Sequence, residues 1–325
     1  MGSSDLGARA TPLGAGAKIA ILLAVALATL TWLTPNLAIP FDWVDAANIV
    51  VSAVFVTLPV AILFCASRER WTLRASILGL VLFALCSAGL TVLIRNAVGP
   101  TGLYAALSSI ATVGWAGCLG FTVASLFRDK NLLLPAAIVL ATVDMVIVFA
   151  PSGTVKQALG SEVGRAVFES IAFSIPTAGR AEPLAMIGPA DFLFLGMFFL
   201  AIHRFQMNSR ATIFAIVPAL VLYLWVAIFF GHVELAGLPL RALPALLPIS
   251  VVVLLANRKE FRLTQSEKAM TLVLGILCLA AVSAVVYAAS NRAQTQRPSG
   301  RNESPMRAAA SSMLTGPSAA APVSK

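Results

Sequence analysis

Long apolar segments dominate this sequence and restrict what it can fold into. A helix needs about 20 residues to cross the roughly 30 Å hydrocarbon core of a bilayer, and nine segments come close to that length. They are Lys18–Leu33, Asn48–Cys65, Ser76–Ile94, Leu103–Phe127, Leu132–Ala150, Leu184–His203, Ala211–Phe230, Leu238–Ala256 and Met270–Ala289. Only 11% of the residues are charged, whereas soluble domains carry about a quarter. The sequence therefore predicts an all-α polytopic membrane protein with about nine transmembrane helices.

The cations, which give the chain a net charge of +9, are spread over the predicted loops. Because they form no single basic patch, we expect no nucleic-acid partner. If the spans alternate, 13 cations lie on the side of the N-terminus and five on the opposite side, leaving aside the C-terminal tail. The thirteen are Arg9, Lys18, Arg68, Arg70, Arg74, Arg128, Lys130, Arg204, Arg210, Arg258, Lys259, Arg262 and Lys268. Cytoplasmic loops are enriched in Lys and Arg, so we expect a cytoplasmic N-terminus, an extracytoplasmic C-terminus and a first span that stays as an anchor.

Composition separates the ends of the chain from its spans. Residues 1–16 and 291–325 are rich in small and polar residues without apolar periodicity, so we expect both to be disordered. Residues 17–131 hold the N-terminal spans, and residues 257–290 hold the last one. Between them, the long connection Pro151–Pro183 is apolar enough to lie on the membrane surface or to pair with an extended peptide. A plain spacer is an equal alternative.

Two acidic residues lie well inside predicted spans, Asp144 in "LATVDMVIVFAP" and Asp191 in "IGPADFLFLGMFFL". A carboxylate near the bilayer centre costs at least about 3 kcal/mol, and such residues usually serve function. At about 1.5 Å per helical residue, Asp144 lies roughly 12 Å and Asp191 roughly 11 Å from the extracytoplasmic face. We therefore expect the two carboxyl groups to meet.

An adjacent pair of carboxyl groups is compatible with two chemistries. Two acids about 3 Å apart share one proton, so that one acts as general base on a water while the other donates to a carbonyl oxygen. This is the chemistry of aspartic proteases, and it needs no metal or cofactor. Intramembrane acids also serve as proton relays in transporters and channels. On the acids alone, the two interpretations are equally supported.

The surroundings of the two acids resemble those in one family. Presenilins and signal peptide peptidases, the intramembrane aspartyl proteases, carry Tyr-Asp on one helix, Gly-x-Gly-Asp on the next and Pro-Ala-Leu on a later helix. This chain has, in the same order, Val143 and Asp144, then Gly188, Pro189, Ala190 and Asp191, then Pro244, Ala245 and Leu246. Residues 242–250, "ALPALLPIS", are similar to the presenilin "ALPALPIS" with one Leu added. The resemblance covers roughly residues 130–256.

The resemblance implies hydrolysis of peptide bonds within the transmembrane helices of single-span substrates. Residues 132–256 would be the catalytic region, with Asp144 and Asp191 as the catalytic pair. Gly188, Pro244, Ala245 and Leu246 would bind and position the unwound substrate. No metal or cofactor is implied, and the expected partners are substrate helices and membrane lipid. The predicted topology matches the polarity of signal peptide peptidases and favours substrates with a cytoplasmic N-terminus.

The sequence departs from the family pattern at two positions beside the acids. Val143 stands where the family has tyrosine, and Ala190 stands where it has glycine, so that an added methyl group would hinder close backbone approach. One span is missing before Asp144 and one is added after Pro244. A catalytically silent, presenilin-like membrane chaperone is therefore a further alternative, beside the protease and the proton-coupled transporter or channel.

Pro189 predicts where the helix of Asp191 begins. Proline is favoured in the first turn of a helix, so we expect the helix to start there and "LAMIG" before it to be extended. Asp191 would then lie at the positive end of the helix dipole, which favours its charged form. This predicts Asp191 as the base and Asp144 as the acid. The Ala-rich chain with few glycosylation sites suits a bacterial inner membrane.

Overall fold

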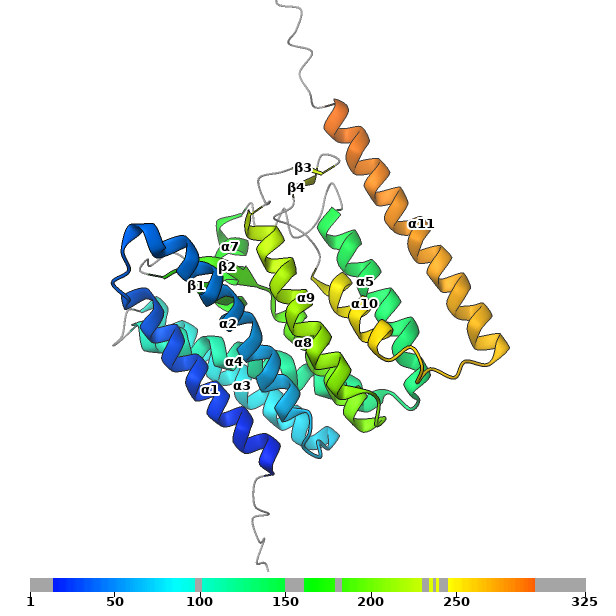
Figure 1. The fold of residues 1–325 in the computed structure, drawn as a ribbon, viewed down its shortest axis with the longest axis horizontal. Coiled ribbons are helices and arrows are strands. Elements are labelled where there is room, and N and C mark those ends of the chain that lie inside the picture. Colours follow the sequence, from blue (N-terminus) through cyan, green and yellow to red (C-terminus); the bar gives the residue numbers. More distant parts are fainter. Residues whose placement is uncertain are drawn as a thin grey trace, which may run out of the picture.

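The computed structural model describes residues 14–96, 101–149, 161–178, 183–229, 234–235, 238–239 and 245–295. Helices that run up and down side by side make up most of it, and two short strand pairs lie toward one end (Figure 1). The helices are α1 (Ala15–Leu33), α2 (Val44–Ala66), α3 (Leu73–Arg95), α4 (Thr101–Leu126), α5 (Leu133–Phe149), α7 (Glu162–Ile171), α8 (Pro189–Arg204), α9 (Ser209–Phe229), α10 (Leu246–Ala256) and α11 (Gln265–Thr295). The strands are β1 (Phe173–Pro176), β2 (Pro183–Ile187), β3 (Glu234–Leu235) and β4 (Leu238–Pro239).

Seven helices in the described part of the chain are long and apolar enough to cross a membrane, namely α1, α2, α3, α4, α5, α9 and α11. The predicted class is confirmed at this level: the protein is a helical, polytopic membrane protein. The count of nine spans is not confirmed. The predicted spans Leu184–His203 and Leu238–Ala256 each begin in a strand, and their helices, α8 and α10, have only 16 and 11 residues. An apolar strand raises hydropathy as much as an apolar helix does, which explains the difference.

Glycines allow α4 to pack directly on the backbone of α8. A Cβ atom at Gly120 would overlap the carbonyl oxygen of Leu193 and lie 2.7 Å from the amide nitrogen of Met197. A Cβ atom at Gly196 would lie 2.9 Å from the carbonyl oxygen of Gly117. Small residues at such crossings are a common way for membrane helices to approach closely. One hydrophobic core extends from α2 and α4 through α8 to α9 and α10, so the predicted regions 17–131 and 132–256 form one packed unit.

A buried amide fixes the end of α10 against the start of α9. Asn257, which follows α10, is 1% exposed. Its Nδ2 donates to Thr212 Oγ1 at 2.8 Å, and its Oδ1 accepts from the backbone N–H of Asn208 at 2.9 Å. Because every polar atom of this side chain has a partner, its burial carries little penalty. The contacts set the depth of α10 relative to α9.

The long connection between α5 and α8 is structured in its described part. Ser161 caps α7 by accepting a hydrogen bond from the backbone N–H of Gly164 at 3.0 Å. The sequence of α7, "EVGRAVFESI", alternates apolar and polar residues at helical spacing, as in a helix lying at an interface. Strands β1 and β2 then form an antiparallel pair in which Ser174 faces Met186. The connection is therefore more than an unstructured spacer, and β2 leads directly into α8.

The ends of the described chain differ from the prediction. Helix α1 begins at Ala15, inside the segment 1–16 predicted to be disordered, and α11 extends to Thr295, beyond the predicted start of the tail at residue 291. Glu69 stabilises the first turn of α1, because its Oε1 accepts the backbone N–H of Ala17 at 2.9 Å. The remaining residues of the two predicted disordered segments, 1–13 and 296–325, lie outside the described residues.

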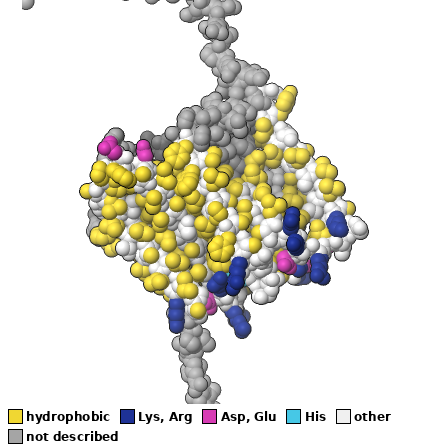
Figure 2. All heavy atoms as spheres, viewed as in Figure 1, with side chains coloured by type: hydrophobic (Ala, Val, Ile, Leu, Met, Phe, Trp, Pro, Cys, Tyr) yellow, Lys and Arg dark blue, Asp and Glu magenta, His cyan; other side chains and the backbone are white. Residues whose placement is uncertain are grey.

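Cations gather at one end of the bundle. Described Lys and Arg residues flank the start of α1 and the connections α2–α3, α4–α5, α8–α9 and α10–α11, which all lie at the same end in Figure 1. Figure 2 shows Lys and Arg side chains toward this lower end and hydrophobic side chains over most of the visible face above it. The chain enters α1 at this end and leaves α11 at the other.

Candidate functional site

The start of α8 places Asp191 inside the bundle. Gly188 is the N-cap with extended backbone, and Pro189 is the first helical residue, which confirms the predicted start of this helix. Asp191 is the third helical residue, and its carboxylate turns back toward the N-cap, where the backbone N–H of Gly188 interacts with it. A carboxylate at this position satisfies one of the N–H groups that a helix start leaves without a partner.

The start of α10 provides a hydrogen-bond donor to the other acid. The backbone N–H of Leu246, the first residue of α10, donates to Oδ2 of Asp144 at 2.9 Å. Asp144 lies in α5, which packs against α10. This N–H has no partner within its own helix, because the first four N–H groups of a helix face outward from its end. The hydrogen bond therefore anchors α10 to α5 at the acid.

The structure places the two acids within electrostatic range of each other. The carboxyl groups of Asp144 and Asp191 are close enough to interact electrostatically, as the depth estimate predicted. Counting from the cationic end gives the same picture, since Asp144 follows Lys130 by fourteen residues and Asp191 precedes Arg204 by thirteen. Each acid is therefore about 20 Å along its helix from that end.

Both acids interact with the start of a helix, and this changes the predicted division of roles. The sequence assigned the base to Asp191 because of the dipole of its own helix. The structure gives Asp144 a comparable environment, because its Oδ2 accepts the first N–H of α10. Helix starts favour negative charge in both cases, so the helix dipole does not distinguish a base from an acid in this pair. The two carboxyls are better treated as one coupled pair.

A tyrosine that the sequence did not single out lies beside the pair. Tyr223 is in α9, which packs against α10, and it interacts electrostatically with both Asp144 and Asp191. A tyrosine within an apolar segment is usually a packing or interfacial residue, so its residue type alone does not mark it as part of a site. Its position was open to prediction, because it follows Arg210 by thirteen residues and therefore has the same depth of about 20 Å as the acids.

The structure describes three of the four predicted substrate-binding residues and places them at the starts of α8 and α10. Pro244 lies outside the described residues, whereas Ala245 is the N-cap of α10 and Leu246 its first residue. Leu246 acts through its backbone, which no sequence motif specifies directly. A Cβ atom at Gly188 would meet only Asp191 Oδ2, at 3.9 Å, so the backbone there has open space on its free side.

The two departures from the family pattern do not obstruct the acids in this structure. Ala190 is exposed, so its methyl group points away from the packed side of α8, and the predicted hindrance at this position is not observed in the free protein. Val143 is 46% exposed on the surface of α5. Where the family has a tyrosine next to the first aspartate, this chain has Val143, and the tyrosine that interacts electrostatically with both acids is Tyr223 of α9.

The strand pair beside the site has one enclosed and one accessible strand. β1 packs against α2 and α4, and its side chains are mostly buried. β2 is more exposed, with Pro183 and Met186 open to the surroundings. In the described residues β2 pairs only with β1, so its other edge is unpaired. An unpaired edge is a template for an additional strand, and this one leads through Gly188 to Asp191.

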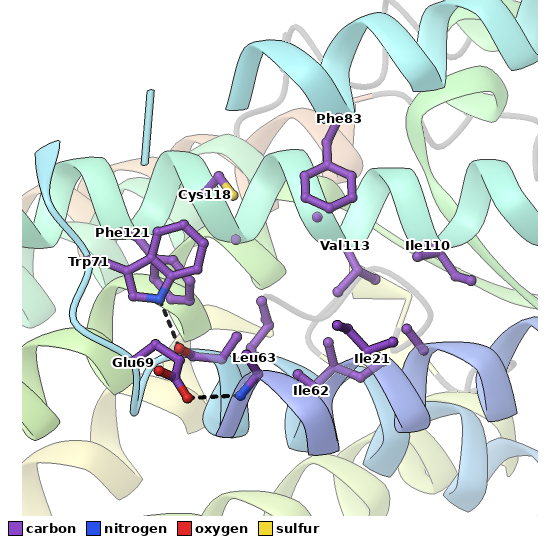
Figure 3. Close-up of a pocket in the computed structure, with 16 residues that line it drawn as sticks. Ile21, Ile62, Leu63, Glu69, Trp71, Phe83, Ile110, Val113, Cys118 and Phe121 are labelled. Atoms are coloured by element: carbon purple, nitrogen blue, oxygen red, sulfur yellow. Dashed lines mark hydrogen bonds between the residues drawn. The ribbon is translucent and has the colours of Figure 1, made fainter. Parts of the chain in front are cut away.

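The larger described cavity lies elsewhere and is unsuited to hydrolysis. It has a volume of about 220 Å³ and lies among α1, α2, α3 and α4. Figure 3 shows its apolar lining, including Phe83, Val113 and Ile62. At its end, Oε1 of Glu69 already accepts the backbone N–H of Ala17. Trp71 Nε1 donates to the carbonyl oxygen of Ala66 at 2.8 Å. Within the described residues, no cluster of three or more His, Cys, Asp or Glu side chains is placed to hold a metal ion.

Comparison with known proteins gives no assignment: no family model, no curated protein and no solved structure matches this chain.

Proposed function

We propose that the protein is an intramembrane aspartyl protease that hydrolyses peptide bonds within membrane-spanning helices. The observation that supports this most is that Asp144 and Asp191, from α5 and α8, lie at a similar depth inside a helical membrane protein and close enough to interact electrostatically. Each carboxylate is also held by a helix start, at Leu246 and at Gly188. A paired carboxyl site with fixed donors is what general acid–base hydrolysis of an amide requires.

The proposed reaction uses the pair as one unit with a single shared proton. The ionised carboxyl removes a proton from a water molecule, and the water oxygen attacks the carbonyl carbon of the scissile amide. The protonated carboxyl donates its proton to the carbonyl oxygen. When the tetrahedral intermediate breaks down, the proton held by the first carboxyl passes to the departing amide nitrogen and the C–N bond is broken. One hydroxyl of the intermediate returns its proton to the second carboxyl, which leaves a carboxylic acid product and restores the pair. Since Leu246 binds Oδ2 of Asp144, Oδ1 is the oxygen left to exchange protons.

The substrate must be extended where it is cut, because the backbone of a helix is occupied by its own hydrogen bonds. The unpaired edge of β2 offers a place for such a segment, through main-chain hydrogen bonds of the kind that add a strand to a sheet. The segment would then run past Gly188, whose free side is open, to the acid pair. Single-span helices are the substrate class that fits this arrangement.

Orientation is part of the proposal. The cationic end of the bundle would face the cytoplasm, which places the N-terminus inside, the C-terminus outside and the acid pair nearer the outer face. A bacterial inner membrane is the proposed location. Substrates with a cytoplasmic N-terminus follow from the resemblance to signal peptide peptidases.

The test is cleavage of a model single-span helix by the purified protein in detergent, with Asp144→Asn and Asp191→Asn as variants. Each variant should abolish cleavage, and the double variant should be no worse than either single one, because the pair acts together. Asn keeps the size of the side chain and an oxygen that accepts the helix-start N–H, so folding should be retained. Asp129→Asn, in the loop before α5, is the matched control and should cleave normally.

Other functions give different results in the same experiment. A proton relay predicts no cleavage by the native protein and loss of proton-coupled flux in proteoliposomes for both Asn variants. A silent chaperone predicts neither activity, and binding of client helices that the Asn variants retain. Absence of cleavage by the native protein across pH 5–8, with several single-span substrates, would refute the protease proposal.

A further inference from the structure

Three buried polar side-chain atoms in the described residues have no hydrogen-bond partner in the protein: His203 Nε2, Tyr223 Oη and Ser250 Oγ. Of these, Tyr223 Oη is close enough to both Asp144 and Asp191 to interact with them electrostatically. A hydroxyl group buried without a partner costs about 1–3 kcal/mol, and in a membrane no bulk solvent reaches it to reduce that cost. The position of this hydroxyl therefore calls for a specific ligand.

The depth of Tyr223 supports the same conclusion without reference to electrostatics. Tyr223, Asp144 and Asp191 each lie thirteen or fourteen residues from the cation that marks the common end of their helices, Arg210, Lys130 and Arg204. They come from three different helices, α9, α5 and α8. In addition, α10, whose first N–H binds Asp144, packs against α9. The three polar groups thus lie at about the same level, on three helices that each pack against α10.

We propose that Tyr223, together with Asp144 and Asp191, binds a water molecule, and that this water is the nucleophile of the reaction. The inference builds on the proposed protease function. A buried water typically makes about three hydrogen bonds, and these three side chains supply that number. The Tyr223 hydroxyl can accept from the water or donate to it, so it fits the water before and after a carboxyl takes the proton.

Binding by Tyr223 addresses a difficulty of hydrolysis inside a membrane, where water is scarce. The two carboxyls alone leave the water free to move between them, whereas a third partner on α9 fixes the direction of its lone pair. Misplacement of a reacting group by about 1 Å can cost roughly 100-fold in rate. Tyr223 is a positioning residue for the water; the bonds that form and break are those of the water, the amide and the two carboxyls.

The experiment compares Tyr223→Phe with the native protein and with Tyr104→Phe, which removes the same atom from α4. Since Tyr223 Oη has no protein partner, Tyr223→Phe should fold as the native protein does. We expect kcat to fall about 100-fold with KM within about twofold, because substrate binding does not involve the hydroxyl. Tyr104→Phe should leave both constants unchanged. A kcat for Tyr223→Phe within twofold of the native value would overturn the inference and leave the protease proposal standing.

A spectroscopic measurement tests the water site without cleavage. Infrared difference spectra between low and neutral pH report the C=O stretch of the acid pair, identified by its loss in Asp191→Asn. Exchange into ¹⁸O-labelled water identifies the O–H stretch of a bound water. We expect Tyr223→Phe to shift the carboxyl band and remove the bound-water band, and Tyr104→Phe to leave both. Unchanged bands in Tyr223→Phe would overturn the inference. Changed bands in a protein that cleaves no substrate would uphold the water site and refute the protease.

Discussion

Replacing Gly120 by Ala should separate two helices and thereby disturb the acid pair. The added Cβ atom would overlap the carbonyl oxygen of Leu193 and lie 2.7 Å from the amide nitrogen of Met197, where ordinary contacts begin at 3.4 Å. The obstacles are backbone atoms of α8 and have no rotamer to change. Helices α4 and α8 must therefore move apart by at least roughly 0.7 Å.

The expected cost of Gly120→Ala is about 1–3 kcal/mol, the range for overpacking a tight interior. Thermal unfolding in detergent should show a clear fall in Tm. Because α8 carries Asp191, we also expect kcat for helix cleavage to fall by about tenfold or more at temperatures where the variant is folded. The matched control is Gly89→Ala in α3, where an added Cβ meets nothing within 4 Å and the helix propensity of Ala favours stability. Equal Tm values for the two variants would refute the packing argument.

Two further predictions concern α10 and the topology. Leu246→Ala keeps the backbone N–H that binds Asp144 but removes a side chain that is only 5% exposed, so it should lower stability and, by loosening the start of α10, cleavage. Leu247→Ala, at a position 40% exposed, should leave Tm nearly unchanged and cleavage within about twofold. Similar effects of the two substitutions on unfolding and cleavage would contradict a role for the packing of the Leu246 side chain. A cysteine introduced as Ser161→Cys should react with a membrane-impermeant thiol reagent in intact cells, whereas Lys259→Cys at the cationic end should react only after lysis. The reverse pattern of labelling would overturn the proposed orientation.

Some of the site was open to prediction because it depends on side-chain type and depth. Asp144 and Asp191 stand out in apolar spans, and the count of residues from the span ends is enough to place them together. Pro189 marked the start of α8 correctly, since proline is common in the first helical turn. The same count from Arg210 would have placed Tyr223 at the acids. The residue type gives no such signal, because a tyrosine in an apolar segment is usually packing or interfacial.

Other parts of the site leave no clear signal in the sequence. The interaction of Leu246 with Asp144 uses a backbone N–H, which every residue except proline possesses. Strand β2 was included in a predicted span because hydropathy does not depend on backbone conformation. The segments Leu184–His203 and Leu238–Ala256 are not confirmed as full-length spans, because their helices begin only at Pro189 and at Leu246.

These two late helix starts explain why the acids can exist in the membrane at all. A helix that begins inside the bundle leaves its first N–H groups without partners, and each such group in an apolar region costs free energy. Asp191 interacts with the N–H of Gly188, and Asp144 with that of Leu246. Each acid therefore offsets the free-energy cost of an unpaired N–H at a helix start. In return, the N–H offsets the cost of placing the acid in the membrane. In the proposed protease, structural capping and catalysis would therefore share the same two side chains. Substitution by Ala would remove both roles at once, whereas Asn retains the acceptor oxygen and removes only the exchangeable proton. A loss of cleavage in the Asn variants with unchanged thermal unfolding would consequently identify chemistry, and not helix capping, as the reason these acids are needed.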